Sequence, residues 1–586
     1  MFKRVFTPLL FLVFAWFIVT NNDAKTIIAG IAIFLIGMHY LENGFKQLSG
    51  RTLEIMLEKF TSTTPKAITS GFLATSVVQS SSLISVIIIS FLSAELIGLS
   101  QAIGVIFGSN LGTTTTAWLV SSFGLKISIS QYALPMLILG VIMQFSRETR
   151  YKGLGSVLIG LGFIFLGIAY MKDGFETLKS GLDLAEYAMQ GYLGVFVYIL
   201  LGSAATVIIQ SSSATMAIII TALAAGQIDY INALSLAIGA NVGTTVTAIM
   251  GAMASNSNGK RLATAHFIFN ITTGLLAVIF IYPLKELIDT LAPLFSIAES
   301  NDAMKLALFH TVFNIIGVLA VAPFIKQLVQ YLQTLFCIIE EERGKPKYLS
   351  NEVMQIPASA LAALRKETIH LYDKSLETIA HAMNLHRTDI FSDTEISQVL
   401  AHSKNSIPID IDEMYQNDIK NLYSAIIHYA SISQSHMSQE ANHIIYELKL
   451  TARYIIEMVK DVRELQKNLN IFAKCNNQFI IDQYNELRAQ LITVLRVIQQ
   501  IRNYEGEEDI LMQVELQKEK LNDNEILSNT NIDTLIRENK IDSKMASSLM
   551  NDVGFTHSIC KKLLKSAVIL WVKEKEIKAL GDEYES

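Results

Sequence analysis

Two copies of the tetrapeptide Gln-Ser-Ser-Ser stand within strongly apolar stretches of this 586-residue chain. The copies are Gln79, Ser80, Ser81 and Ser82, and Gln210, Ser211, Ser212 and Ser213. Polar side chains in such surroundings are costly unless something hydrogen-bonds to them. A hydroxyl group can donate to the oxygen of an anion, and it can also present its own oxygen to a cation. The tetrapeptides therefore point to a site that binds a solute.

A second polar motif follows each tetrapeptide at the same distance. An offset of 131 residues lays Gly71–Ser82 on Gly202–Ser213 and, without a gap, Gly108–Ala117 on Gly239–Ala248. A single register that links two separate motifs indicates an internal duplication. One isolated tetrapeptide would more simply bond to its own helix or to a neighbouring helix. The duplication favours a binding site formed where the two copies meet.

Neither motif contains an arginine, lysine, aspartate or glutamate. A neutral site of low dielectric constant holds a multivalent anion poorly, but it can hold the anion together with balancing cations. Small hard cations take hydroxyl, carbonyl and amide oxygen atoms as ligands. The composition therefore predicts that an oxyanion and alkali cations bind together. Protons stay open as an alternative coupling ion, because His266 or His310 could titrate.

The elements that position these motifs are apolar segments, many of membrane-spanning length. The chain is 51% hydrophobic and 17% charged, whereas soluble domains carry about 25% charged residues. Apolar segments lie near residues 5–19, 26–43, 83–98, 130–146, 153–171, 194–226, 262–283 and 303–325. Several approach the ~20 residues that span hydrocarbon as a helix. Those interrupted by Gly, Ser, Thr or Asn are expected to line a cavity or to be buried in protein.

The chain changes character near residue 335, after which Lys, Glu, Asp, Gln and Asn are frequent. The expected parts are an N-terminal hydrophobic segment over 1–22, a membrane domain over 23–335, a linker over 336–354 and a soluble domain over 355–586. The first part is either an uncleaved helix or a signal peptide. The repeats cover about 66–122 and 197–253. Short basic loops at Ser146–Lys152 and Gly259–Arg261 place the soluble domain in the cytoplasm.

The soluble part is expected to be a bundle of long helices. An apolar stripe is predicted by the residues that recur every three or four positions, which are Ile369, Tyr372, Leu376, Ile379 and Met383. Polar runs near 386–412 and 516–545 are expected to be loops or insertions between helices.

Several function classes are excluded or disfavoured. The net charge of −6 gives no reason to expect nucleic-acid binding. The three cysteines, Cys337, Cys475 and Cys560, have no metal-ligand spacing. We find no nucleotide-binding loop, no H-E-x-x-H and no paired acidic motif in the first half, so an enzyme is not expected.

The duplicated tetrapeptide, together with the motif G-[AS]-N-[LV]-G-T-T-x-T-A, resembles the type II sodium–phosphate cotransporters in their bacterial form, over about residues 26–330. The resemblance implies an all-α membrane domain of two inverted repeats, each with a re-entrant hairpin that carries Gln-Ser-Ser-Ser. It implies that both tetrapeptides bind phosphate and sodium, with Na+ as the coupling ion and no organic cofactor. It also implies supporting ligands, which are Asn110, Thr113, Thr114, Asn241, Thr244 and Thr245.

The stretches Ala265–Asn270 and Phe309–Asn314 resemble the H-x-x-F-N signatures of the same family. Each places a histidine one helical turn before an asparagine. The pairs are His266 with Asn270 and His310 with Asn314. We expect hydrogen bonds between helices, with solute contact as the alternative. Because these copies lie 44 residues apart rather than 131, symmetric roles are not assigned to them.

The soluble part resembles the PhoU-type helical domain through Ile356–Leu371 and Ala452–Leu465. PhoU proteins can hold metal with E-x-x-x-D clusters, and Glu457 and Asp461 match that spacing once. A salt-bridged helix face is the expected role of this pair, with a metal site as the alternative. The resemblance implies a regulatory domain that could contact a phosphate-signalling protein.

Together these features predict a sodium-coupled symporter of inorganic phosphate, embedded in lipid as a multi-pass protein of the plasma (inner) membrane. A membrane-anchored phosphate sensor and a proton-coupled phosphate exporter stay open as competing hypotheses. The direction of transport is open as well.

Overall fold

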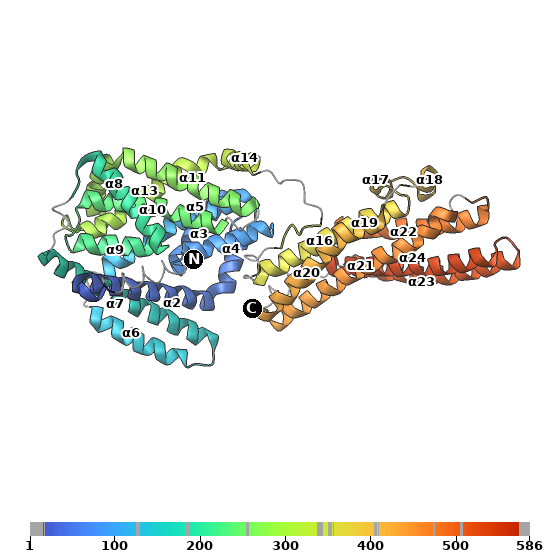
Figure 1. The fold of residues 1–586 in the computed structure, drawn as a ribbon, viewed down its shortest axis with the longest axis horizontal. Coiled ribbons are helices and arrows are strands. Elements are labelled where there is room, and N and C mark those ends of the chain that lie inside the picture. The colour runs from blue at the N-terminus through green and yellow to red at the C-terminus, as the bar shows by residue number, and fades with distance from the viewer. Residues whose placement is uncertain are drawn as a thin grey trace. The chain divides into compact units, whose positions relative to one another are not determined.

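The computed structural model consists of helices joined by turns and loops in the part of the chain that it describes (Figure 1). It describes residues 16, 18–124, 129–181, 188–252, 257–336, 344–349, 354, 357–403, 407, 410–472, 475–503 and 508–572. These ranges contain helices and no strand, which confirms the predicted all-α fold class. The predicted N-terminal segment over 1–22 lies largely outside them.

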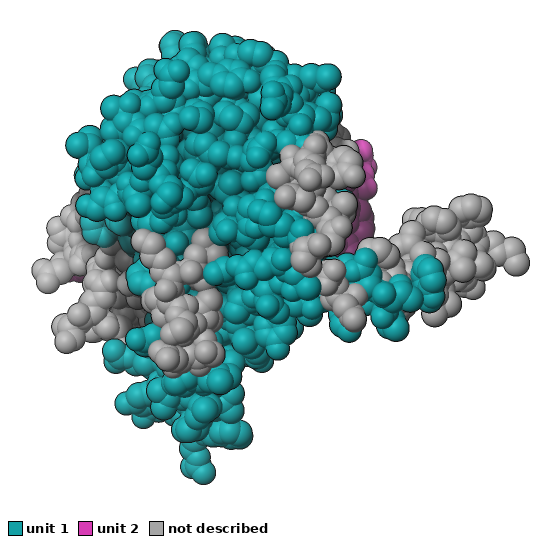
Figure 2. All heavy atoms as spheres, turned by 90° about the vertical axis from the view of Figure 1, so that its left-hand side faces the viewer, with its two compact units in different colours: residues 1–337 teal, residues 338–586 magenta. Residues whose placement is uncertain are grey.

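The chain forms two compact units, residues 1–337 and 338–586. Figure 2 shows their atoms in teal and magenta. We call them the membrane unit and the C-terminal unit, and each is described by itself.

The membrane unit contains long apolar helices joined by short ones. Its helices are α2 (Asn22–Lys59), α3 (Thr64–Val78), α4 (Ser81–Ser93), α5 (Leu99–Leu119), η1 (Val120–Gly124), α6 (Ile129–Gln144), α7 (Thr149–Gly181), α8 (Gly191–Ile209), α9 (Ser212–Ala224), α10 (Tyr230–Ala252), α11 (Ser257–Ile279), α12 (Ile281–Leu291), η3 (Ala292–Phe295), α13 (Asp302–Val321), η4 (Ala322–Phe324) and α14 (Ile325–Leu335).

Six stretches of the described residues are long and apolar enough to cross a membrane. They are Ala24–Leu48, Thr149–Lys179, Gly191–Ile209, Tyr230–Met250, Ser257–Ile279 and Asp302–Leu335. The apolar helices α4 and α9 have only 13 residues each. At 1.5 Å per residue such a helix reaches about 20 Å, which is less than the ~30 Å hydrocarbon thickness. The unit is therefore a multi-pass membrane structure that also contains short apolar helices, among them α4, α6 and α9.

Glycines let α2 and α7 pack backbone to backbone. A Cβ atom on Gly37 would lie 2.6 Å from the nitrogen of Ile164 and 2.8 Å from the oxygen of Gly160. Gly30 and Gly44, one heptad away on either side, make equivalent contacts with α7. Small residues permit this close approach between membrane helices, where dispersion contacts replace the hydrophobic effect as the driving force.

The pairs α3–α5 and α8–α10 repeat one packing arrangement. A Cβ atom on Gly108 would collide with the carbonyl oxygen of Ile68, and one on Gly239 would collide with that of Ile199. The two contacts are related by the 131-residue offset of the sequence motifs. This correspondence is what an internal duplication predicts; the inverted orientation of the repeats stays a prediction.

The C-terminal unit is built from long helices that lie side by side (Figure 1). Its helices are α16 (Pro357–Ala382), α17 (Arg387–Ile390), α18 (Ile396–His402), α19 (Ile411–Met414), η5 (Tyr415–Ile419), α20 (Lys420–Ser433), η6 (Gln434–His436), α21 (Gln439–Phe472), α22 (Gln478–Asn503), α23 (Glu508–Arg537), α24 (Ser543–Ala567) and η7 (Val568–Val572). The predicted apolar stripe on α16 is confirmed. Tyr372, Leu376, Ile379 and Met383 are buried in the core of this unit.

The prediction of a loop over 516–545 is wrong, because α23 continues through Arg537. The helix buries a narrow stripe that includes Val514, Leu521 and Ile532. Its other faces are largely exposed, and they carry polar side chains together with the apolar side chains of Met512, Leu516, Ile526 and Leu527. A single stripe at helical spacing is enough to hold a helix against a neighbour, even where most side chains are polar.

Candidate functional site

Both tetrapeptides interrupt a helix in the same way. α3 ends at Val78, and Gln79 adopts a left-handed conformation with φ 59° and ψ 22°. Gln210 ends α8 with φ 58° and ψ 24°. A left-handed backbone is unusual for a residue other than glycine, and such conformations gather at functional sites. The apolar segment predicted over 194–226 is thus two helices, α8 and α9, that meet at this break.

The serine after each glutamine caps the next helix. The Oγ atom of Ser80 accepts a hydrogen bond from the backbone N–H of Leu83 at 3.2 Å, and α4 begins at Ser81. Ser211 accepts from the N–H of Ala214 at 3.2 Å in the same way. Serine favours this position because its oxygen satisfies an otherwise free N–H group of the first turn.

These breaks provide two helix N-termini next to serine hydroxyls. The first N–H groups of a helix lack intrahelical acceptors, and the helix dipole places partial positive charge there. An N-terminus therefore attracts anions without any charged side chain. The breaks supply what the neutral motifs otherwise lack, which is partial positive charge.

Thr116 on α5 contacts both tetrapeptides. Its hydroxyl donates to the Oε1 atom of Gln79 at 2.7 Å and lies 3.3 Å from the Oγ atom of Ser213. The Nε2 group of Gln79 donates to the Oγ1 atom of Thr115 at 2.8 Å. The structure thus brings the two copies together, as the duplication predicted. Thr115 and Thr116 were missed among the predicted site residues, although they belong to the motif Gly108–Ala117.

The two glutamines differ in their surroundings. Gln79 is half-buried, and its carboxamide also donates to the backbone oxygen of Ser76 at 2.6 Å. Gln210 is exposed, and within the described residues its carboxamide makes no hydrogen bond. The serines differ as well, since Ser82 is exposed whereas Ser213 is buried. One copy is therefore fixed by side-chain contacts, and the other carries an exposed carboxamide that has no hydrogen-bond partner among the described residues.

The predicted threonine ligands bond to their own helices. Thr113 donates to the backbone oxygen of Asn110 and Thr114 to that of Leu111, both at 2.7 Å. Thr244 and Thr245 do the same in α10, at 3.0 and 2.6 Å. Each hydroxyl proton is thus occupied, while the lone pairs of the oxygen can still accept. Their role as solute ligands stays a prediction.

The histidines of the H-x-x-F-N stretches contact the asparagines of the second motif. The Nε2 atom of His266 lies 3.1 Å from the Oδ1 atom of Asn110, and that of His310 lies 3.1 Å from the Oδ1 atom of Asn241. These bonds join α11 to α5 and α13 to α10, as expected for hydrogen bonds between helices. The two histidines make equivalent contacts with asparagines that the 131-residue offset relates, although the sequence had not allowed symmetric roles to be assigned to them. Their 44-residue spacing conceals this equivalence because it differs from the repeat offset.

Only the second of these contacts extends to the following asparagine. The Nδ2 group of Asn241 donates to the Oδ1 atom of Asn314 at 3.0 Å. In the first copy, the Nδ2 group of Asn110 and both polar atoms of the Asn270 carboxamide are buried without a hydrogen-bond partner among the described residues. A buried polar group without a partner carries a desolvation cost of about 1–3 kcal/mol.

The acidic pair of the C-terminal unit is held by cationic side chains. The Nζ group of Lys562 lies 2.9 Å from Asp461 and 3.4 Å from Glu457, and Arg453 pairs with Glu457 at 2.9 Å. Burial opposes the ionised form of Glu457, but the hydrogen bonds from Arg453 and Lys562 hold its pKa below the usual value. The described residues contain no group of three or more His, Cys, Asp or Glu side chains placed to hold a metal. The metal site stays a prediction without a supporting contact.

Comparison with known proteins locates the membrane unit within a family. The family model described as Na+/Pi-cotransporter matches residues 33–173 and 184–298. The uncharacterized protein YqeW of Bacillus subtilis is 29% identical over 263 residues, which cover 45% of this chain and 84% of YqeW. No solved structure matches this chain.

Two further relatives carry names that refer to phosphate. YjbB of Salmonella typhimurium, whose name assigns it provisionally to inorganic phosphate export, is 27% identical over 267 residues, covering 45% of this chain and 48% of YjbB. The human sodium-dependent phosphate transport protein 2B is 39% identical over 88 residues, which cover 14% of this chain and 12% of that protein. The chain thus spans about half of YjbB.

The matched segments contain both tetrapeptides and both copies of the second motif. The C-terminal unit lies outside them, so its likeness to PhoU stays a prediction. The family model and the relatives named for phosphate support a Na+/Pi-cotransporter family for the membrane unit of this chain.

Proposed function

We propose that this protein transports inorganic phosphate across a membrane together with sodium ions. The observation that carries the proposal is the meeting of the two tetrapeptides at Thr116, which lies 2.7 Å from Gln79 and 3.3 Å from Ser213. Two helix N-termini and their serine hydroxyls thereby belong to one site.

Phosphate fits this site by its charge and geometry. Its oxygen atoms can accept from the free N–H groups at the starts of α4 and α9 and from the serine hydroxyls. The partial charges of two helix N-termini do not neutralise a dianion. The names of YjbB and of the human relative support phosphate as the solute.

Sodium would supply the missing positive charge. Serine and threonine hydroxyls, carboxamides and backbone carbonyls are the oxygen ligands that small hard cations take. Because the motifs contain no basic side chain, anion binding without cations would be weak. The need for charge balance therefore couples the two solutes, and Gln79 and Gln210, at the two helix breaks, would line their site.

Transport requires that the site opens to each side of the membrane in turn. In transporters built from repeats, the two repeats rock against each other around a fixed site. The side-chain contact between Thr116 and Ser213 is weak, at 3.3 Å, and can break and reform without loss of the helices that carry it. We place the protein in the plasma (inner) membrane with its C-terminal unit in the cytoplasm, where it would act as a PhoU-like regulatory domain.

A second candidate function is phosphate export, which the name of YjbB favours. Both functions use the same site, and the ion gradients decide the direction of net flow. Coupling to protons in place of sodium, or sensing of phosphate without transport, would use the same site as well.

Radiolabelled phosphate flux in proteoliposomes tests the proposal. A sodium gradient should drive saturable phosphate flux, while choline and pH gradients should not, and reversing the sodium gradient should reverse the flow. Gln79→Ala and Gln210→Ala should abolish the flux. Gln144→Ala is a matched control, because the partners of Gln144 among the described residues are Lys152 and Ser156, away from the tetrapeptides. Flux at the wild-type rate without sodium would reject the coupling, and phosphate binding without any flux would favour a sensor.

A further inference from the structure

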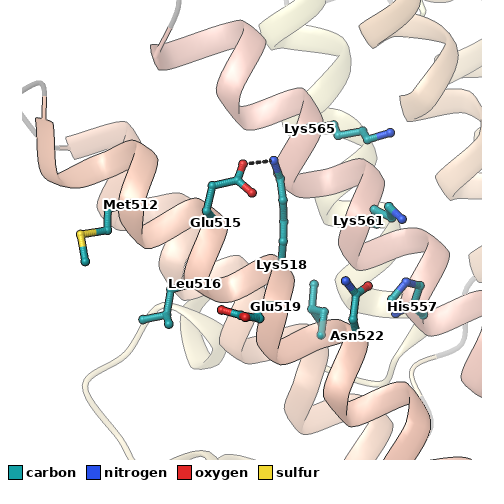
Figure 3. A pocket seen from close by; sticks show the side chains of 10 residues that line it. Met512, Glu515, Leu516, Lys518, Glu519, Asn522, His557, Lys561 and Lys565 are labelled. Carbon is teal, nitrogen blue, oxygen red and sulfur yellow. Dashed lines mark hydrogen bonds and ion pairs between the residues drawn. The ribbon is translucent and has the colours of Figure 1, made fainter.

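Two cavities of the C-terminal unit differ in how their charges are compensated. The larger, of about 730 Å3, lies between α23 and α24. Figure 3 shows the ion pair between Lys518 and Glu515 there. Its nitrogen and oxygen atoms are 2.6 Å apart. Lys565 on α24 lies 5.7 Å from the ring centre of Tyr454. The charged side chains that line this larger cavity are of both signs and lie mostly at the surface, so the cavity selects no particular ligand.

The second cavity has a volume of about 490 Å3 and contains one buried charge. Its walls come from α18, α21 and α22. Leu400 and Ile481 form an apolar wall, and Ser397 and Asn485 contribute uncharged polar groups. Arg488 is the single arginine or lysine among the described residues that line it. Small-molecule sites typically have volumes of about 300–1,000 Å3 and pair apolar walls with a few polar groups in this manner.

The guanidinium of Arg488 has no anionic partner among the described residues. The residue is only 6% exposed. Its hydrogen bonds all end on uncharged oxygen atoms, which belong to Met383, Asn384, Ser403 and Asn485. None of the acidic side chains in the described ranges forms an ion pair with it. Elsewhere in the unit the fold does supply such a partner, since Arg502 pairs with Asp373 at 2.7 Å.

A buried cation without a counter-ion is expensive for a folded protein. Burial lowers the pKa of Arg488 to about 10, so the group stays charged at neutral pH. The guanidinium has five N–H groups. The one on Nε and the two on Nη2 donate to Met383, Asn384 and Ser403, and one on Nη1 donates to Asn485 at 3.1 Å. One Nη1 N–H remains for a ligand.

We propose that this cavity binds the oxyanion group of a small organic acid or phosphate ester, with Arg488 as its counter-ion. The carboxamide of Asn485, already aligned by Arg488, would provide a second donor. Leu400 and Ile481 would contact the body of the ligand. A cavity of about 490 Å3 accommodates more than a lone phosphate ion, which favours a ligand with such a body.

A purely structural role for Arg488 is the competing explanation. Its bonds to Met383 and Asn384 satisfy carbonyl groups at the end of α16, where the helix dipole favours a cation. Arg496, two turns further along α22, makes similar bonds to the carbonyls of Ile390 and Thr394. Arg496 does not line the cavity, so its substitution removes similar carbonyl contacts without changing the proposed ligand site.

Calorimetric titration of the purified full chain tests the proposal. The probes are adenosine monophosphate, citrate and inorganic phosphate, in a Gln79→Ala, Gln210→Ala background that removes the site proposed in the membrane unit. We expect at least one probe to bind, and R488Q to weaken that binding by at least about tenfold. R496Q should leave it unchanged.

Asn485→Asp keeps the proposal testable if R488Q does not fold. The new carboxylate would sit beside the guanidinium and neutralise it while the bond to Arg488 is kept. Binding should then fall by at least about tenfold in a protein that unfolds no earlier than the parent. The probe that binds identifies whether the ligand is an acid, a phosphate ester or phosphate itself. Failure of all three probes at millimolar concentration, or equal binding by folded N485D, would overturn the proposal.

Discussion

The two copies of the tetrapeptide share their backbone and differ in their side-chain contacts. Gln79 and Gln210 have nearly the same φ and ψ angles, and Ser80 and Ser211 cap the following helices at the same distance. Yet Gln79 is held by Ser76, Thr115 and Thr116, whereas Gln210 is exposed.

The neighbouring histidine contacts show the opposite asymmetry. Asn241 is tied to both His310 and Asn314, whereas Asn110 is tied to His266 and leaves Asn270 without a side-chain partner among the described residues. Duplication thus fixed the scaffold, and the two copies then diverged in the side chains around it. The first copy holds its glutamine and the second copy holds its asparagine pair, so the two repeats have different hydrogen bonds to break when the site opens.

The largest losses of stability should come from substitutions in the helix pairs α3–α5 and α8–α10, whose backbone packing is the same in both copies. Gly108→Ala and Gly239→Ala each place a methyl group against the carbonyl oxygen of Ile68 or Ile199. Both should lower the stability of the membrane unit by about 3 kcal/mol or more, since the backbones cannot separate without loss of packing. Thermal unfolding in detergent measures this.

Gly554→Ala is the control for these variants, because an added Cβ there has nothing within 4 Å. It should leave the unfolding temperature unchanged or raise it. Strongly unequal losses in the two glycine variants would contradict the view that both copies use one scaffold.

Much of this scaffold could be predicted from the sequence. The 131-residue register and the neutral tetrapeptides in apolar surroundings predicted two equivalent helix breaks and a shared site. Thr116 was missed because its contact with Ser213 spans 97 residues and depends on how α5 packs against α9. The equivalence of His266 and His310 was missed because their helices do not follow the repeat spacing. The C-terminal cavity has no local motif, since Arg488 meets Met383 and Ser403 only in the folded unit.

A pH-dependent loss of stability is expected in the C-terminal unit, and it should not affect the two tetrapeptide copies of the membrane unit. Burial raises the pKa of Asp552 to about 6, and the hydroxyl of Tyr484 donates to it at 2.6 Å. As the pH rises from about 4 to 6, Asp552 ionises in the unfolded chain but stays protonated in the folded unit. The free energy of unfolding therefore falls by up to about 3 kcal/mol. Asp552→Asn should remove this loss.

Labelling of the buried thiol of Cys560 at increasing denaturant concentration, in a background without Cys337 and Cys475, reports on this unit. The expected result is a stability that falls between pH 4 and 6 in the parent and stays level in Asp552→Asn. An equal decline in both proteins would assign the pH dependence to other groups.

A smaller difference in stability is expected between variants of Asn314 and Asn270. Asn314→Leu should destabilise the membrane unit by about 2 kcal/mol, because it leaves the amide of Asn241 buried without its acceptor. Asn270→Leu removes a carboxamide that has no partner among the described residues, so it should change the stability by less than about 0.5 kcal/mol or increase it. Unfolding of the two variants under identical conditions gives the difference directly, and equal losses would show that the asymmetry has no energetic meaning.

Equilibrium binding of radiolabelled phosphate to the purified full chain, with sodium or choline as the cation, tests most directly whether the two tetrapeptides form one site. Sodium-dependent binding should be saturable in the parent and at least about tenfold weaker in Thr116→Val, which removes the hydroxyl between Gln79 and Ser213. Thr69→Val should bind normally, since the exposed Thr69 hydroxyl donates to the backbone oxygen of Pro65 in its own helix and contacts neither tetrapeptide among the described residues. Equal phosphate binding in choline, or undiminished sodium-dependent binding by Thr116→Val, would contradict a shared, cation-balanced site.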